Sequence, residues 1–236
     1  MSASEGKNKK DKIYWVPLES SPQVMNKIIE HMGVGASVKF DDVYDFDEEI
    51  LSMVAQPVHA LVFLFPEVEE TNKVREVEAQ SSKDKVSPNI WHMRQTIGNA
   101  CGTMAIFHAL GNNQKTLPIG GNIAAFFDKV NGLSPEDKAK VLEQSKEMEE
   151  AHRSGASEDQ SAAPEADADV DYHYVALTIV DGDLYEIDGG LSVPINHGPA
   201  TDVLRDGVRV AKRRIAAMED KNIGFSLIAL SSVAED

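Results

Sequence analysis

The sequence contains one cysteine, Cys101, so the chain cannot form an internal disulfide. A lone thiol is typical of proteins in a reducing compartment. No apolar run approaches the roughly 20 residues that a membrane-spanning helix needs. Residues 1–12 lack the apolar stretch of a signal peptide. We therefore expect a cytosolic or nuclear protein that does not enter membranes, with 1–12 as a disordered tail.

Basic residues are scarce, with 23 Lys and Arg against 39 Asp and Glu and a formal net charge of −16. This charge would repel a phosphate backbone, so nucleic acid is not an expected partner. It would steer in a basic protein or peptide, although solubility alone also accounts for it. No Cys and His cluster with metal-ligand spacing is present, so no metal or other cofactor is expected. We expect a monomer.

Apolar residues make up 42% of the chain, enough for a core. The periodicity predicts helices over 22–32, 100–110, 123–130, 135–153 and 201–219, and strands over 38–44, 58–65, 172–180, 183–188 and 225–230. The nearly continuous apolar run VHALVFLF (58–65) indicates a central strand buried on both faces. The charged segment 67–87 is expected to be a surface loop or an irregular helix. Without an internal repeat, this mixture predicts one α/β or α+β domain over 13–236.

Local signals mark several boundaries of these elements. Ser21 followed by Pro22 starts a helix that Gly33 ends, and Ser134 with Pro135 starts another. The segment 154–169 (SGASEDQSAAPEADAD) is small, acidic and without large apolar residues, so we expect a long loop. Such loops are often lids over binding sites, and a passive linker is the alternative.

Cys101 lies where the predicted helix 100–110 begins, with Asn99 as its candidate N-cap and Gly111 at its end. The unpaired N–H groups and the dipole at a helix N-terminus favour a thiolate. Gly102 would let a substrate backbone approach closely. The position predicts a cysteine nucleophile. The alternative is a small buried hydrophobic residue.

A cysteine nucleophile needs a base and a group that orients the base. His173 stands at the start of a predicted strand, and Asp188 ends the next one. Asp181-Gly182 between them indicates a two-residue hairpin, in which position 173 pairs with position 190. Asp188 is then a diagonal neighbour of His173 on the same face, within reach of a hydrogen bond. Gln95 could help to hold an oxyanion, or could simply face solvent.

Taken together, these segments resemble the ubiquitin carboxyl-terminal hydrolases, the small, single-domain, papain-like deubiquitinases. The matching motifs are WVPLE (15–19), QTIGNACGT (95–103), LYEIDG (184–189) and PINHG (194–198). The resemblance implies a central antiparallel sheet flanked by helices, a knotted backbone, and a crossover loop (154–169) that limits the size of the leaving group. It implies Cys101 as nucleophile, His173 as base and acid, Asp188 as orienter, and Gln95 in the oxyanion hole.

The same resemblance implies an enzyme that cleaves small adducts, peptides or esters from the C-terminal glycine of ubiquitin through a thioester. Ubiquitin would then contact Pro17, Leu18, Glu19 and Phe225 and the loop residues Ala156, Ser157, Glu158, Asp159 and Gln160. Two alternatives stay open: a ubiquitin-binding module with little turnover, and a hydrolase that prefers a ubiquitin-like modifier.

Overall fold

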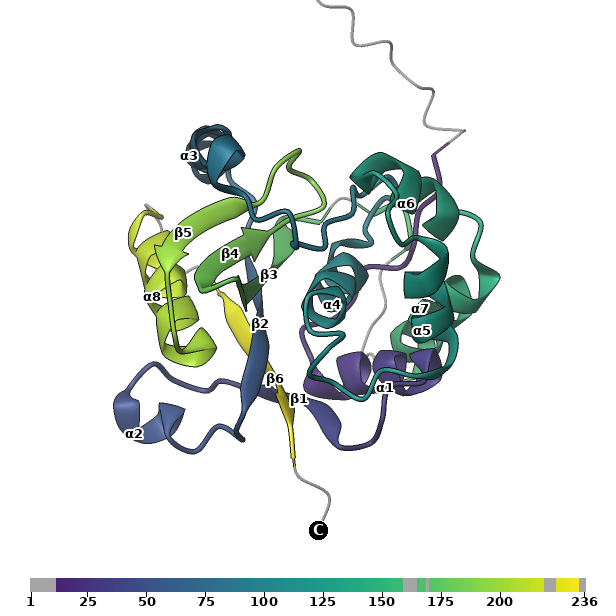
Figure 1. Cartoon of the computed structure of the whole chain (residues 1–236), viewed down its shortest axis with the longest axis horizontal. Helices are drawn as coiled ribbons and strands as arrows, with labels where there is room; N and C mark the ends of the chain where they lie inside the picture. The colour runs from purple at the N-terminus through teal and green to yellow at the C-terminus, as the bar shows by residue number, and fades with distance from the viewer. Residues whose placement is uncertain (1–11, 159–164, 169, 219–223, 234–236) are drawn as a thin grey trace, which may run out of the picture.

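The computed structural model of the protein describes residues 12–158, 165–168, 170–218 and 224–233 (Figure 1). Its strands are β1 (Val38–Asp42), β2 (Val58–Pro66), β3 (Tyr172–Val180), β4 (Asp183–Ile187), β5 (Ile195–Pro199) and β6 (Ser226–Ser232). Its helices are α1 (Pro22–Met32), α2 (Glu48–Leu51), α3 (Glu69–Ser82), α4 (Cys101–Gly111), α5 (Gly121–Lys129), α6 (Pro135–Leu142), α7 (Lys146–Glu158) and α8 (Val203–Ala216), with a 3-10 turn, η2 (Lys83–Lys85), after α3. No helix among these residues is long and apolar enough to cross a bilayer.

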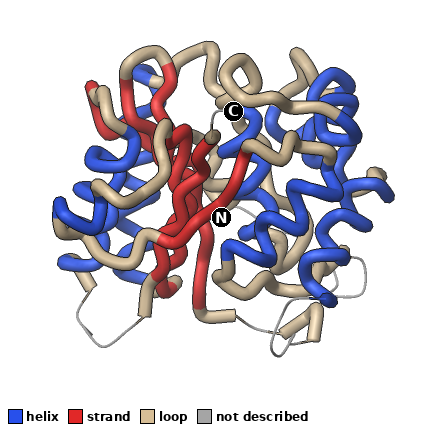
Figure 2. Tube along the Cα trace, turned by 90° about the horizontal axis from the view of Figure 1, so that it is seen from below, coloured by secondary structure: helices blue, strands red, loops and turns tan. Residues whose placement is uncertain are grey.

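The six strands form one antiparallel sheet in the order β1-β6-β2-β3-β4-β5. Helices cover both of its faces: α2 and α8 lie on one side, and α1, α4, α5, α6 and α7 lie on the other (Figures 1 and 2). The expected antiparallel sheet flanked by helices is therefore confirmed.

Burial on both faces explains why β2 is almost entirely apolar. Neighbouring side chains of a strand point to opposite faces. Ala60 and Val62 pack into the core shared with α1 and α4, whereas Leu61 and Phe63 pack into the core beneath α8. The prediction of a central, doubly buried strand over 58–65 is confirmed, with β6 and β3 as its neighbours.

Helix caps are confirmed at two predicted positions. The Ser21 hydroxyl accepts a hydrogen bond from the Val24 backbone N–H, and α1 ends at Gly33 in the left-handed region. The Ser134 hydroxyl accepts from the Asp137 N–H at 3.1 Å. The single helix expected over 135–153 is wrong, because α6 ends at Leu142 and α7 starts afresh at Lys146. Ser145 accepts a hydrogen bond from the Met148 N–H and so begins the second helix.

The boundaries expected for α4 are also wrong. Ala100, not Asn99, is the residue before the first turn, and the helix continues through Gly111. A β-carbon on Gly111 would lie 2.6 Å from the Trp91 ring, so glycine is needed there for a close approach of the indole. Gly111 is therefore needed for packing against Trp91, and it does not cap the end of the helix.

The loop expected over 154–169 is shorter than predicted, because α7 extends to Glu158. Tertiary packing holds these extra residues in the helix. A β-carbon on Gly155 would lie 2.8 Å from the Val24 carbonyl oxygen of α1, and Ala156 is 2% exposed in the core. Ala156 therefore lies buried in a helix and not in a loop as predicted, and its contact with ubiquitin stays a prediction.

Of the two alternatives for the charged segment 67–87, the helix is the one found: Glu69–Ser82 form α3 and Lys83–Lys85 the 3-10 turn η2. The strand β5 and the short helix α2 were not predicted from the sequence. β5 forms one edge of the sheet, where it pairs with Tyr185 and Glu186 of β4.

Candidate active site

The Cys101 side chain lies at the first residue of α4 and is half-buried. The rest of this helix is buried in the core between the sheet and the surrounding helices. Backbone N–H groups in the first turn of a helix have no acceptor within the helix itself. The fold therefore holds a thiol rigidly at the positive end of a buried helix.

The predicted hairpin between β3 and β4 is confirmed. Asp181 and Gly182 both have positive φ angles, 52° and 88°, as a two-residue turn of this hand requires. Ala176 pairs with Ile187, which is the expected register. His173 and Asp188 come together as predicted, with 2.8 Å between His173 Nε2 and Asp188 Oδ1.

The Asp188 carboxylate is 3% exposed and is held from several directions. Its Oδ1 also accepts from the Gly190 N–H at 2.6 Å, and its Oδ2 accepts from Arg75 Nη2 at 2.5 Å. Burial opposes ionisation, but His173, Arg75 and the Gly190 N–H outweigh it and lower the pKa of Asp188. The carboxylate is thus ionised and fixed beside the imidazole.

The ring of His173 is nearly as buried as its partner, at 9% exposure for the whole residue. Burial disfavours the imidazolium, but the Asp188 carboxylate and then the Cys101 side chain outweigh burial and raise the pKa of His173 to about 10. The charged imidazolium is therefore the favoured form at neutral pH.

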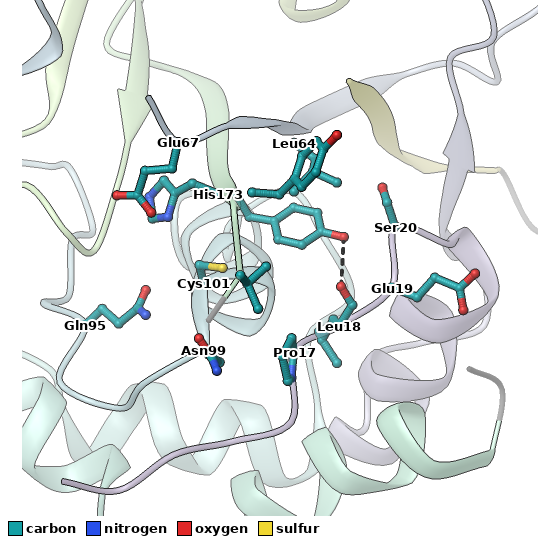
Figure 3. A pocket seen from close by; sticks show the side chains of 13 residues that line it. Pro17, Leu18, Glu19, Ser20, Leu64, Glu67, Gln95, Asn99, Cys101 and His173 are labelled. Carbon is teal, nitrogen blue, oxygen red and sulfur yellow. Dashed lines mark hydrogen bonds between the residues drawn. The ribbon is translucent and has the colours of Figure 1, made fainter. Parts of the chain in front are cut away.

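A cavity of about 470 Å³ opens over these groups, and Cys101, His173 and Gln95 all line it (Figure 3). Gln95 is tied to the β4 end through its backbone N–H, which donates to the Gly189 carbonyl at 2.9 Å. Its carboxamide Nε2 donates to the Ile97 carbonyl at 3.1 Å. All four residues singled out in the sequence are thus brought to one site.

The residues expected to contact ubiquitin lie in different places. Pro17, Leu18 and Glu19 line the same cavity as Cys101. Phe225 is 44% exposed and stacks on Phe46 at the start of β6. Ser157 and Glu158 belong to α7, while Asp159 and Gln160 lie outside the described residues.

Sequence reasoning missed two residues of this site. Arg75 comes from α3, within the segment expected to be irregular, and its buried guanidinium bridges Asp188 and Glu186. Asn99 lines the cavity and donates through Nδ2 to the Ala166 and Ala168 carbonyls. Neither role has a signal in the linear sequence, because both partners are far away along the chain. Among the described residues, no group of three or more His, Cys, Asp or Glu side chains is placed to hold a metal ion.

Three other histidines are buried and favour the neutral form. Burial is the largest cause that lowers the pKa of His92 and of His152 to about 4 and that of His108 to about 3. In the unfolded chain their pKa is near 6.5. Below pH 6.5 the unfolded chain therefore binds protons that the folded protein excludes, and stability decreases as the pH falls toward 4. His173 acts in the opposite sense, because its stabilisation is complete below pH 6.5 and is lost as the pH rises toward 10.

We accordingly expect the melting temperature to be highest near neutral pH and to fall on both sides, because the free energy of unfolding decreases by up to about 1.4 kcal/mol per pH unit and per histidine. Thermal melts between pH 4.5 and 9 measure this dependence. His152→Gln should flatten the acid side, whereas His31→Gln, at an exposed position, should not. A melting temperature that stays constant from pH 6.5 to 4.5 would contradict neutral burial of these rings.

The sequence of this chain is similar to one protein family and to several proteins of known name. A family model described as ubiquitin carboxyl-terminal hydrolase, family 1, matches residues 15–216. A ubiquitin carboxyl-terminal hydrolase of Aplysia californica is 41% identical over 206 residues, covering 86% of this chain and 95% of that protein. Ubiquitin carboxyl-terminal hydrolase 3 of Arabidopsis thaliana is 38% identical over 240 residues and covers 98% of both chains.

A solved structure is similar in fold. It is the Trichinella spiralis UCH37 catalytic domain bound to ubiquitin vinyl methyl ester, with a TM-score of 0.72 and 22% identity, covering 93% of this chain and 96% of that one.

Proposed function

Because the chain belongs to family 1 of the ubiquitin carboxyl-terminal hydrolases, we propose that it removes small adducts, peptides or esters from the C-terminal glycine of ubiquitin. It is a cysteine-type hydrolase of this class. One observation carries the proposal for this chain: the thiol at the start of α4 shares a cavity with a histidine that is hydrogen-bonded to a buried aspartate. This is the arrangement that nucleophilic acyl transfer needs.

In the proposed reaction, the Cys101 thiolate attacks the carbonyl carbon of the terminal glycine, and a carbon–sulfur bond forms. The protonated His173 gives its proton to the leaving amine or alcohol as the bond to the adduct breaks. Water then loses a proton to His173 and hydrolyses the thioester, which releases ubiquitin and restores the Cys101 thiolate. Asp188 keeps the imidazole oriented throughout these steps.

The oxyanion of each tetrahedral intermediate would be held by the Cys101 backbone N–H and the Gln95 carboxamide. A primary amide carries two N–H donors, and one of those on Gln95 already bonds to the Ile97 carbonyl. The bond to Ile97 orients the group and leaves its second N–H for the oxyanion.

Ubiquitin would approach from the side of Pro17, Leu18 and Glu19, which line the cavity next to Cys101. Phe225 would extend this surface, because the adjacent Ser226 pairs with Leu64, another residue of the cavity wall. The net charge of −16 favours encounter with the basic tail of ubiquitin.

The proposal is tested with ubiquitin that carries a fluorogenic amide on its C-terminal glycine. We expect rapid release of the fluorophore, and weaker release from the same amide on a ubiquitin-like modifier. Competition between the two substrates decides the preference. Binding of ubiquitin without release of the fluorophore would support a ubiquitin-binding module instead.

A further inference from the structure

Asn99 has an unusual backbone and an unusual pair of hydrogen bonds. It lies two residues before Cys101 with φ = 57°, in the left-handed region that few residues other than glycine and asparagine adopt. Its carboxamide Nδ2 lies 2.8 Å from the carbonyl oxygen of Ala166 and 2.8 Å from that of Ala168. Both N–H groups of the side chain are thereby committed to one distant segment.

This backbone conformation explains why Asn99 does not cap α4 as its position in the sequence predicts. A capping residue has extended backbone angles and directs its side chain at the first turn of the helix. The left-handed turn at Asn99 instead directs the carboxamide to residues 166 and 168, which lie 67 and 69 positions further along the chain. The turn that presents the thiol and the contact to that segment are therefore made by the same residue.

Segment 165–168 offers little apolar surface of its own. Ala166 and Ala168 are half-buried, and Glu165 and Asp167 are exposed. The one turn within the segment is closed by the Ala168 N–H, which donates to the Glu165 carbonyl at 3.0 Å. Two methyl groups bury little apolar surface, so polar contacts, with the two bonds from Asn99 among them, attach the segment to the rest of the protein.

The attached segment borders the candidate active site. Asn99 lines the cavity over Cys101 and bonds directly to the carbonyls of Ala166 and Ala168, so segment 165–168 lies next to the cavity wall. We propose that Asn99 is a specificity-determining residue: its two hydrogen bonds hold segment 165–168 at the rim of the cavity and thereby exclude bulky adducts from the space beside the thiol. The inference rests on the proposed function and assigns the size limit to a particular side chain.

The test compares two substrates: ubiquitin with a small fluorogenic amide, and ubiquitin fused linearly to a stably folded domain. Asn99→Gly removes both donors but keeps a residue that adopts the left-handed turn. Asn99→Asp also tolerates that turn and places a carboxylate against the two carbonyls. We expect both variants to raise the ratio of kcat/KM for the fusion over kcat/KM for the amide by about tenfold, the scale set by two hydrogen bonds.

The ratio separates this role from general damage to the nucleophile turn, because such damage slows both substrates equally. Asn131→Gly, at an exposed asparagine outside the cavity, should leave the ratio unchanged. Limited proteolysis by a glutamate-specific protease provides a second readout. Cleavage after Glu165 should be about tenfold faster in Asn99→Gly than in the wild-type protein.

An unchanged ratio in both Asn99 variants, or an unchanged rate of cleavage after Glu165, would overturn the inference. That result is distinguishable from failure of the proposed function, in which the wild-type protein would release neither adduct from ubiquitin.

Discussion

Replacing Cys101 with alanine is expected to reduce kcat/KM for the ubiquitin C-terminal amide by at least about 10⁴-fold. The variant loses the atom that forms the thioester, and no other cysteine exists in the chain to replace it. Loss of the nucleophile in comparable catalytic triads costs about 10⁴- to 10⁶-fold. Fluorophore release over hours at high enzyme concentration measures the residual rate.

The variant should still bind ubiquitin, because Cys101 is a half-buried residue of the cavity lining and alanine fits any space that cysteine fills. Calorimetry with free ubiquitin checks this point and shows that the loss of turnover does not come from unfolding. Cys101→Ser is the matched control for shape, and its hydroxyl is a much weaker nucleophile than a thiolate. Turnover by the alanine variant within tenfold of wild type would refute the assignment of the nucleophile.

Replacing Arg75 with methionine is expected to have the next largest effect, on both stability and activity. Arg75 is 3% exposed, and its guanidinium donates to Glu186 at 2.7 Å and to Asp188 at 2.5 Å. Its removal leaves two buried carboxylates with one cation fewer between them. Breaking a buried pair in this way costs about 3–5 kcal/mol, which urea denaturation measures directly.

The activity should fall as well, because Arg75 holds the Asp188 oxygen that does not contact His173. A carboxylate free to rotate orients the imidazole less well, and small misplacements of catalytic groups cost about 10²-fold. The loss should appear in kcat more than in KM, since Arg75 does not line the cavity.

Lys73 provides a matched control on the same helix. It pairs with Glu69, but both side chains are largely exposed, and such pairs contribute little. Lys73→Met should leave the rate and the denaturation midpoint close to those of wild type. If Arg75→Met changed the rate and the denaturation midpoint as little as Lys73→Met, the buried network around Asp188 would be unimportant for activity and stability.

The sequence by itself determined the local features of this protein. Asp181-Gly182 fixed the hairpin register, because a two-residue turn with both φ angles positive leaves one way to pair the strands. That register brought His173 beside Asp188. The position of Cys101 at the start of an apolar helix was also evident, since the apolar pattern begins there. These relations involve few residues and short separations along the chain.

Only the tertiary structure decided the relations between distant segments. Arg75 reaches Asp188 across 113 positions, and nothing in the polar pattern of α3 marks the one side chain that is buried. Asn99 was predicted to cap a helix and instead holds residues 166 and 168. Gly155 and Ala156 were predicted to lie in a loop, but contact with α1 keeps them helical. Local propensity contributes only fractions of a kcal/mol per residue, whereas packing and buried hydrogen bonds contribute more and depend on what the fold places opposite each side chain.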